Sequence, residues 1–135
     1  MKNLKEVNEE LAAPIFCNQV EYHPLLDQFE LLEYASEQDL LVTAYSPLAQ
    51  GEVFNIPLLQ ELSEKYGKTP SQIALRWLVE QEQVVAIPKA SSRAHMEENL
   101  DIYDFTLEDD DFYAIDDLDK NRRIVNPDFA PEWDN

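Results

Sequence analysis

The stretch from Lys89 to Ser92 combines residue types that could bind an anion. Lys89 supplies a cation, Ser91 and Ser92 supply hydroxyls, and the sequence RAHMEENL that follows predicts a helix. The backbone N–H groups at a helix N-terminus favour negative charge, and phosphate groups are common ligands there. These residues therefore indicate an anion site directly behind the apolar run VVAIP.

A second feature is the pair of amides, Asn18 and Gln19, inside the apolar run IFCNQVEY. A buried amide without hydrogen-bond partners is costly, so such side chains have partners in a folded protein. The residues alone leave two alternatives open. Either neighbouring backbone groups of the core satisfy the amides, or the amides face a ligand.

The charge balance excludes several classes of partner. The chain has 28 acidic and 10 basic residues, a formal net charge of -18, which repels nucleic acids and anionic membranes. The acids could form a metal site, an interaction tail or a uniformly acidic surface. They are dispersed, and neither Gly51 nor Gly67 lies in a calcium-loop pattern. We therefore favour a halophile-type acidic surface and predict no metal site.

Length and composition predict one domain. A chain of 135 residues with 44% hydrophobic residues can build one core. No apolar run approaches the roughly 20 residues of a membrane span, and the N-terminus lacks the apolar region of a secretory signal. The single cysteine, Cys17, is typical of a reducing compartment. We expect a cytoplasmic protein in which Cys17 is a small buried hydrophobic residue.

Helical and strand-like patterns alternate along the chain. Apolar spacing predicts strands at 15–22, 40–45 and 84–88, and helices at 4–13, 27–39, 57–67, 69–81, 92–100 and 107–118. Strands that alternate with helices favour an α/β fold with a parallel sheet covered by helices. A sheet of three such strands has two open edges, which indicates that the sheet is incomplete.

Particular residues are expected to bound or fill these elements. Asp27 and Thr69 are the expected N-caps of their helices, and Gly67 is the expected end of the helix before Thr69. Phe29 and Trp77 fall on helix faces that we expect to pack into the core.

Four motifs, NQVEYHP, AYSPLAQG, KYGKTPSQIALRW and IPKASS followed by EENL, occur in this order. Together they resemble the C-terminal half of the aldo-keto reductases, which are NADPH-dependent (β/α)8 barrels, over residues 4–118. The resemblance implies a partial (β/α)8 TIM barrel made of strands six to eight with their helices. Residues 1–135 would then be the C-terminal part of one aldo-keto reductase domain, with its ligands at the carboxyl ends of the strands.

The resemblance implies roles for residues late in the first two strands and in the loop after the second. Gln19 would hydrogen-bond the carboxamide of the nicotinamide ring, and the ring of Tyr45 would stack on the nicotinamide. Ser46 and Leu48 would lie along the pyrophosphate, where a hydroxyl, backbone N–H groups and the flexible Gly51 suit such a ligand.

At the third strand end the resemblance implies the other half of the cofactor site. Lys89, Ser91 and Ser92 would hold the 2′-phosphate and the adenine ribose, with Glu98 and Asn99 near the adenine.

One position departs from the family pattern, because His95 stands where many members carry an arginine. Arginine binds phosphate through two parallel hydrogen bonds, whereas histidine carries less charge at neutral pH. Arg93 lies two residues earlier and points in a different direction on the helix. We include His95 among the cofactor ligands and expect NADPH rather than NADH.

No catalytic residue is expected in this chain. The family's catalytic Tyr, Lys, Asp and His come from the N-terminal half, and neither His23 nor His95 matches the catalytic histidine. His23 is expected to be structural, in the turn after the first strand. By the resemblance the tail FAPEW loops over the barrel mouth, where Trp133 would contribute an aromatic wall.

Two functions of different classes follow. The first is the cofactor-binding half of a reductase that converts small aldehydes or ketones to alcohols by hydride transfer, with a complementing N-terminal half. The alternative is a catalytically inactive remnant that binds a nucleotide or associates with other chains, because open strand edges favour association. A longer reading frame with an earlier start is a third expectation.

The charge imbalance predicts that salt stabilises the folded chain. Raising KCl from about 0.05 M to about 1 M shortens the screening length and weakens the repulsion between carboxylates. The midpoint of thermal unfolding, followed by circular dichroism, should therefore rise. Equal midpoints at the two concentrations would contradict an acidic surface that limits folding.

Overall fold

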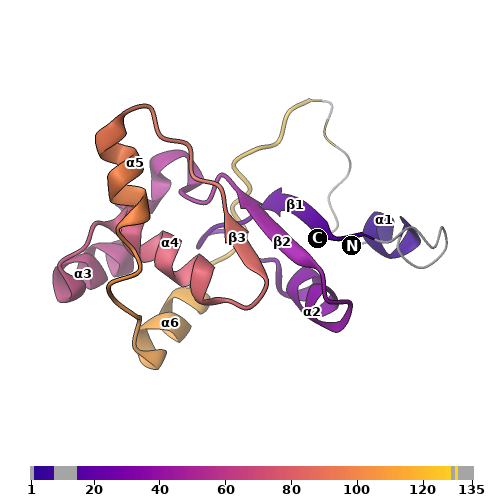
Figure 1. The fold of residues 1–135 in the computed structure, drawn as a ribbon, viewed down its shortest axis with the longest axis horizontal. Coiled ribbons are helices and arrows are strands. Elements are labelled where there is room, and N and C mark those ends of the chain that lie inside the picture. The colour runs from indigo at the N-terminus through magenta and orange to yellow at the C-terminus, as the bar shows by residue number, and fades with distance from the viewer. Residues whose placement is uncertain (1, 8–14, 129, 131–135) are drawn as a thin grey trace.

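The computed structural model describes residues 2–7, 15–128 and 130. Three parallel strands, β1 (Cys17–Glu21), β2 (Leu41–Tyr45) and β3 (Val84–Ala86), form one sheet in the order β1-β2-β3 (Figure 1). Helices connect the strands, so the predicted α/β fold with a parallel sheet is confirmed. Within the described residues neither β1 nor β3 has a second neighbouring strand.

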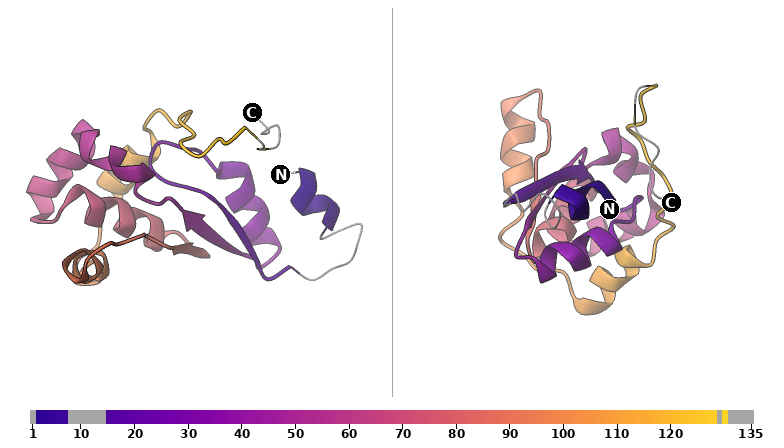
Figure 2. Two further views of the ribbon diagram at one scale, coloured as in Figure 1. Left: turned by 90° about the horizontal axis from the view of Figure 1, so that it is seen from above. Right: turned by 90° about the vertical axis from the view of Figure 1, so that its right-hand side faces the viewer.

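Most helical elements differ from their predicted ranges by a few residues at the ends, and one element, the 3-10 segment 49–55, lies where no helix was predicted. The elements are α1 (Lys2–Lys5), α2 (Phe29–Glu37), the 3-10 element η2 (Ala49–Asn55), α3 (Pro57–Tyr66), α4 (Pro70–Glu80), α5 (Arg93–Leu100) and α6 (Asp109–Asp116). In Figure 2, α1 lies at the far end of the molecule from α3 and α4. The second half of the predicted first helix lies outside the described residues.

The two faces of the sheet differ in their surroundings. Val42 and Ala44 are completely buried under α2 and α4, as expected for a covered sheet. On the opposite face Cys17 and Gln19 are exposed, and Val85 retains 43% exposure. The expectation of a buried Cys17 is therefore wrong, and its Sγ lies 2.9 Å from the Thr43 hydroxyl. The described helices cover one face only, which is the physical reason for the difference.

Helix α2 shows a further correction. Its N-cap position is Gln28 rather than Asp27, although the Asp27 carboxylate accepts the N–H of Phe29 at 2.8 Å. Phe29 does not reach the core and is 66% exposed. The buried face of the helix instead carries Leu31, Tyr34 and Ala35, which are three and four residues apart, and Phe29 falls outside this helical spacing.

The connection between α3 and α4 follows the predicted pattern. Gly67 ends α3 in the left-handed conformation, with φ 64°. Thr69 caps α4 in a capping box, accepting the N–H of Gln72 at 3.3 Å while the Gln72 side chain accepts the N–H of Thr69 at 2.9 Å. Pro70 occupies the first turn, where its missing N–H has no cost.

Trp77 is the centre of the main core, as predicted. Its ring is completely buried between Tyr22, at 5.3 Å between centroids, and Phe112, at 6.4 Å. The ammonium group of Lys120 lies 4.5 Å from the ring centroid, in a cation–π geometry. These contacts join the residue that follows β1 to α4 and to α6 and the segment after it.

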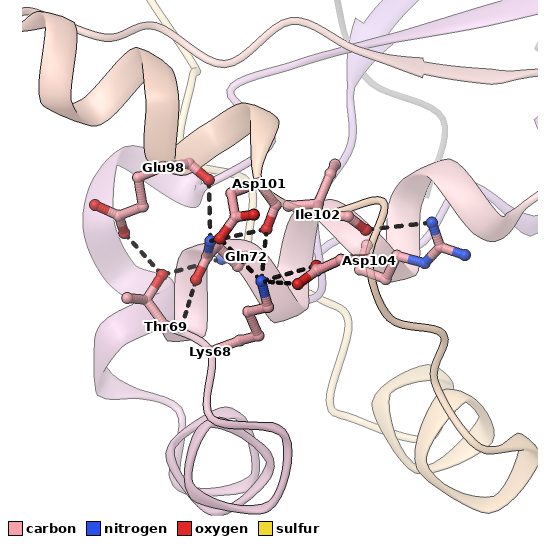
Figure 3. A network of polar contacts seen from close by, with 8 residues as sticks. Lys68, Thr69, Gln72, Glu98, Asp101, Ile102 and Asp104 are labelled. Atoms are coloured by element: carbon pink, nitrogen blue, oxygen red, sulfur yellow. Dashed lines mark hydrogen bonds and ion pairs between the residues drawn. The ribbon is translucent and has the colours of Figure 1, made fainter.

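A polar network positions α5 against α4 (Figure 3). The Gln72 amide donates to the backbone carbonyls of Glu98, at 3.1 Å, and Asp101, at 2.9 Å. Lys68 forms ion pairs with Asp101 at 2.9 Å and Asp104 at 2.8 Å. Because α5 buries no side chain of its own, these bonds at its C-terminal end are its main anchor to α4.

The conformation of Gly67 gives a direct test of this connection. A Cβ at residue 67 would meet no atom within 4 Å, so only backbone strain penalises a larger residue. Gly67→Ala should lower the free energy of unfolding by about 1 kcal/mol. Gly67→Asn should cost less, because asparagine tolerates the left-handed region. Equal losses for the two variants in urea titrations would contradict this explanation.

Candidate functional site

The carboxyl ends of the three parallel strands bring the predicted site residues to one edge of the sheet. Gln19 pairs in register with Thr43. Two residues nearer that edge, Glu21 pairs with Tyr45. Lys89 follows the end of β3 by three residues. The topology therefore places Gln19 and Tyr45 on adjacent strands, and Lys89 three residues beyond the end of the third strand.

The side chains of Gln19 and Lys89 differ from most polar side chains of the described residues. Within the described residues neither the amide of Gln19 nor the ammonium group of Lys89 has a hydrogen-bond or ion-pair partner, and both side chains are exposed. Lys65, by contrast, contacts both Glu108 and Asp111 at 2.7 Å. In so acidic a chain, an exposed lysine without a carboxylate partner is a strong candidate for an anion ligand.

The loop after β2 has an unusual backbone. Ser46, Ala49 and Gln50 have φ between 47° and 54°, and Gly51 has φ 99°. Non-glycine residues adopt such angles only where the surroundings hold them, and they cluster at functional sites. Burial of the Ala49 side chain and the bond from its N–H to the Ser46 carbonyl, at 2.8 Å, hold the turn. Ser46 and Leu48 thus lie in a shaped loop rather than an open one.

The start of α5 has the local geometry of a capped helix N-terminus. Ser92 is the N-cap, and its hydroxyl accepts the N–H of His95 at 3.2 Å. The hydroxyl hydrogen of Ser92 can still be donated to a ligand. Ser91, Ser92 and His95 are all exposed. Arg93 is turned along the helix, with its Nε 2.7 Å from Glu97.

The two residues predicted to lie near an adenine differ in their surroundings. One carboxylate oxygen of Glu98 accepts the hydroxyl of Thr69 at 2.7 Å, so part of this side chain serves the contact between α4 and α5. Asn99 lines an apolar cavity of about 330 Å³ together with Ala90, Met96 and Leu100. Glu98 and Asn99 are adjacent in the sequence, but their side chains therefore have different surroundings.

The comparisons with known proteins identify the family. The sequence model of the Aldo/keto reductase family matches residues 1–120. The chain is a member of the aldo-keto reductase family. The glyoxal reductase of Bacillus subtilis is 39% identical over 127 residues, which cover 93% of this chain and 46% of that protein.

Solved structures of aldo-keto reductases and related enzymes have the same fold over this region. The crystal structure of a putative 2,5-diketo-D-gluconic acid reductase B superposes with a TM-score of 0.92 at 43% identity. It is matched over 99% of this chain and 48% of its own length. A mutant of Gox0644 in complex with NADPH superposes with a TM-score of 0.86 at 29% identity, over 96% of this chain and 48% of that one. This aldo-keto reductase chain therefore spans less than half the length of these relatives.

The family that the resemblance predicted is thereby confirmed. No described helix is both long and apolar enough to cross a membrane. In the residues that the structure describes, His, Cys, Asp and Glu side chains form no group of three or more suited to a metal ion. The cytoplasmic location and the halophilic surface stay predictions, and Trp133 lies outside the described residues.

Glu21 and His23 form a buried pair beside the site that the sequence analysis did not assign. Both side chains are completely buried, and His23 Nε2 lies 3.0 Å from Glu21 Oε1. The N–H of Leu25 donates to His23 Nδ1 at 3.2 Å, so the proton sits on Nε2 and is donated to Glu21. The signal in the sequence was a glutamate within an apolar run. The expected structural role of His23 agrees with this geometry.

The buried histidine predicts a pH dependence of stability. Burial lowers the pKa of His23 below its usual value, outweighing the hydrogen bond and charge of Glu21, which raise it. The unfolded chain then binds a proton that the folded chain excludes, so this histidine weakens stability as pH falls below about 6.5.

His23→Gln removes this titration and keeps an amide near Glu21. The loss of stability between pH 7 and 5.5, measured in urea titrations, should be smaller in the variant by up to about 1.4 kcal/mol per pH unit. The comparison between the two proteins cancels the titration of the carboxylates common to both. The same slope in both would contradict the assignment.

Proposed function

We propose that this chain provides the cofactor-binding part of an NADPH-dependent aldo-keto reductase, which reduces small aldehydes or ketones to alcohols. The observation that carries the proposal is the row of Gln19, Tyr45 and Lys89 on adjacent strand ends, with Gln19 and Lys89 lacking partners among the described residues. The family membership and the NADPH complex of a structural neighbour support it. The cofactor supplies the hydride, and these residues orient it.

Each residue has a role in this proposal. The Gln19 carboxamide donates to and accepts from the carboxamide of the nicotinamide, which fixes the ring in its plane. The ring of Tyr45 stacks against the nicotinamide and exposes the opposite face to the substrate. Ser46 and Leu48 contact the pyrophosphate through the constrained loop whose φ angles are positive.

Lys89 is the main determinant of NADPH preference in this proposal. Its free ammonium group pairs with the 2′-phosphate, and Ser91 and Ser92 add hydroxyl donors at the start of α5. His95 adds a weaker contact than an arginine would, and Arg93 is already paired with Glu97. Lys89 therefore supplies most of the positive charge for phosphate selectivity in this proposal.

Glu98 and Asn99 contact the adenine in the same arrangement. Glu98 uses one oxygen for the hydroxyl of Thr69, which leaves the second oxygen to accept the adenine amino group. Asn99 offers both a donor and an acceptor beside it.

The remaining βα units of the barrel come from sequence beyond these 135 residues, in the same polypeptide or in another. In this proposal β1, β2 and β3 are strands six to eight, and the catalytic groups belong to the other units. The open edges of the sheet support this, together with exposed apolar side chains next to β3. They are Val85, Ile87, Met96, Leu100 and Tyr103. The same surface favours the alternative of a non-catalytic association fragment.

A fluorescence titration of the purified chain with NADPH and NADH, in molar KCl, tests the cofactor site. Lys89→Gln should weaken NADPH binding about tenfold, because a charge-assisted hydrogen bond is lost, and should leave NADH binding unchanged. Lys65→Gln is the matched control, since Lys65 is ion-paired on α3. It should bind NADPH like the unmodified chain.

The outcomes separate the proposals. Saturable NADPH binding that Lys89→Gln weakens supports the cofactor-binding function. A folded chain that binds neither nucleotide, or binds both equally with and without Lys89, would contradict it. Self-association in sedimentation experiments without nucleotide binding would favour the association fragment.

A further inference from the structure

The carboxylate of Glu21 is the most heavily bonded buried group near the site. Its side chain has no exposure. Oε1 accepts the backbone N–H of Ile124 at 2.6 Å, and Oε2 accepts the N–H of Val125 at 3.0 Å. His23 donates to Oε1 at 3.0 Å, and Arg123 Nη1 lies 3.6 Å from Oε2. Glutamate side chains are rarely buried, and a buried carboxylate needs hydrogen-bond donors around it. The number of donors around Glu21 therefore indicates that its carboxylate has a specific task.

The bonds from Glu21 to Ile124 and Val125 join parts of the chain that are more than 100 residues apart. The segment after α6 runs beside the turn that follows β1, where the N–H of Asp27 donates to the carbonyl of Lys120 at 3.1 Å and the N–H of Arg122 donates to the carbonyl of Leu25 at 2.9 Å. In Figure 1 this yellow segment passes the end of β1. The Glu21 carboxylate binds the next residues of the same segment.

The segment lies next to the nicotinamide end of the proposed site. Glu21 pairs in register with Tyr45, and the N–H of Tyr22 donates to the Tyr45 carbonyl at 3.3 Å. The charges of Glu21 and Arg123 both reach the Tyr45 hydroxyl, where Glu21 raises and Arg123 lowers its pKa, after burial as the main cause of a raised value. The pKa of Tyr45 therefore depends on both Glu21 and Arg123.

We propose that Glu21 is a positioning residue, whose carboxylate clamps residues 123–125 beside Tyr45 and so makes the C-terminal segment a wall of the nicotinamide end of the site. The identity of the ligand rests on the proposed function, whereas the clamp rests on the contacts of Glu21. The wall consists of the backbone of residues 123–125 and the Arg123 side chain, whose Nη1 lies 3.6 Å from Glu21 Oε2.

The chain offers a matched control for this clamp. Glu52 also binds the segment, through an ion pair of 2.8 Å between its Oε2 and Arg122 Nη2, but both side chains are partly exposed. Surface pairs of this kind contribute little to stability. Glu52→Gln therefore removes a carboxylate contact to the same segment without removing a buried acceptor.

The first measurement is backbone amide hydrogen exchange by NMR in the 135-residue chain. In Glu21→Ala, the N–H groups of Ile124 and Val125 should exchange at least about tenfold faster, because each loses a bond to a charged acceptor. The N–H of Val42, bonded to the Gln83 carbonyl at 2.8 Å, reports global opening and should change less. Glu52→Gln should leave all three unchanged.

Glu21→Gln decides the question if the alanine variant does not fold. Glutamine keeps one acceptor oxygen and places an NH2 group in the other position, so only one of the two amides should lose protection. The ring resonances of Tyr45 should also shift in Glu21→Gln and not in Glu52→Gln. Such a shift would show that residues 123–125 have moved relative to Tyr45, which a change in overall stability alone would not cause.

Binding of two ligands separates this inference from the proposed function. Glu21→Gln should weaken NADPH binding and leave adenosine 2′,5′-bisphosphate, which lacks the nicotinamide, unaffected. If the unmodified chain binds neither ligand, the proposed function fails, while the exchange data and the Tyr45 resonances still decide the clamp. Protection of Ile124 and Val125 that persists in the folded variants, or unchanged Tyr45 resonances, would overturn it.

Discussion

The parallel pairing of β1, β2 and β3 is the constraint on which the rest of this structure depends. Because parallel strands end at the same edge of their sheet, residues from three separate parts of the chain meet there. The ladder continues for one residue past β3, where the N–H of Ile87 donates to the Ala44 carbonyl at 3.2 Å. This places Lys89 just beyond the edge, as the proposed phosphate contact requires.

Scarcity of positive charge shapes the surface of the molecule. With 10 bases for 28 acids, most lysines and arginines in the described residues lie against carboxylates, and several of these pairs join separate elements. Lys65 links α3 to α6, and Lys68 links the start of α4 to the connection after α5. Lys89 differs from these residues, because its exposed ammonium group has no carboxylate partner among the residues that the structure describes.

Buried polar groups connect segments that are distant in the sequence and that the small sheet does not join. Apolar burial joins α2 and α4 to one face, but the turn after β1 and the C-terminal segment meet through backbone hydrogen bonds and the Glu21 carboxylate. Such bonds are directional, so they determine the path of the segment more closely than hydrophobic contact does. The nicotinamide end of the proposed site is consequently built from the first strand and the last described segment together.

The sequence by itself determined the local features. The parallel α/β order, the left-handed Gly67, the Thr69 cap and the buried Trp77 all follow from interactions between near neighbours or from apolar spacing, and the structure confirms them. The four motifs indicated the family, whereas the cofactor contacts stay predictions. Burial was decided by tertiary structure: Cys17 and Phe29 are apolar yet exposed, because burial depends on which elements cover a face. The Glu21 clamp was likewise invisible, since its partners lie more than 100 residues away and donate through backbone groups that every residue type shares.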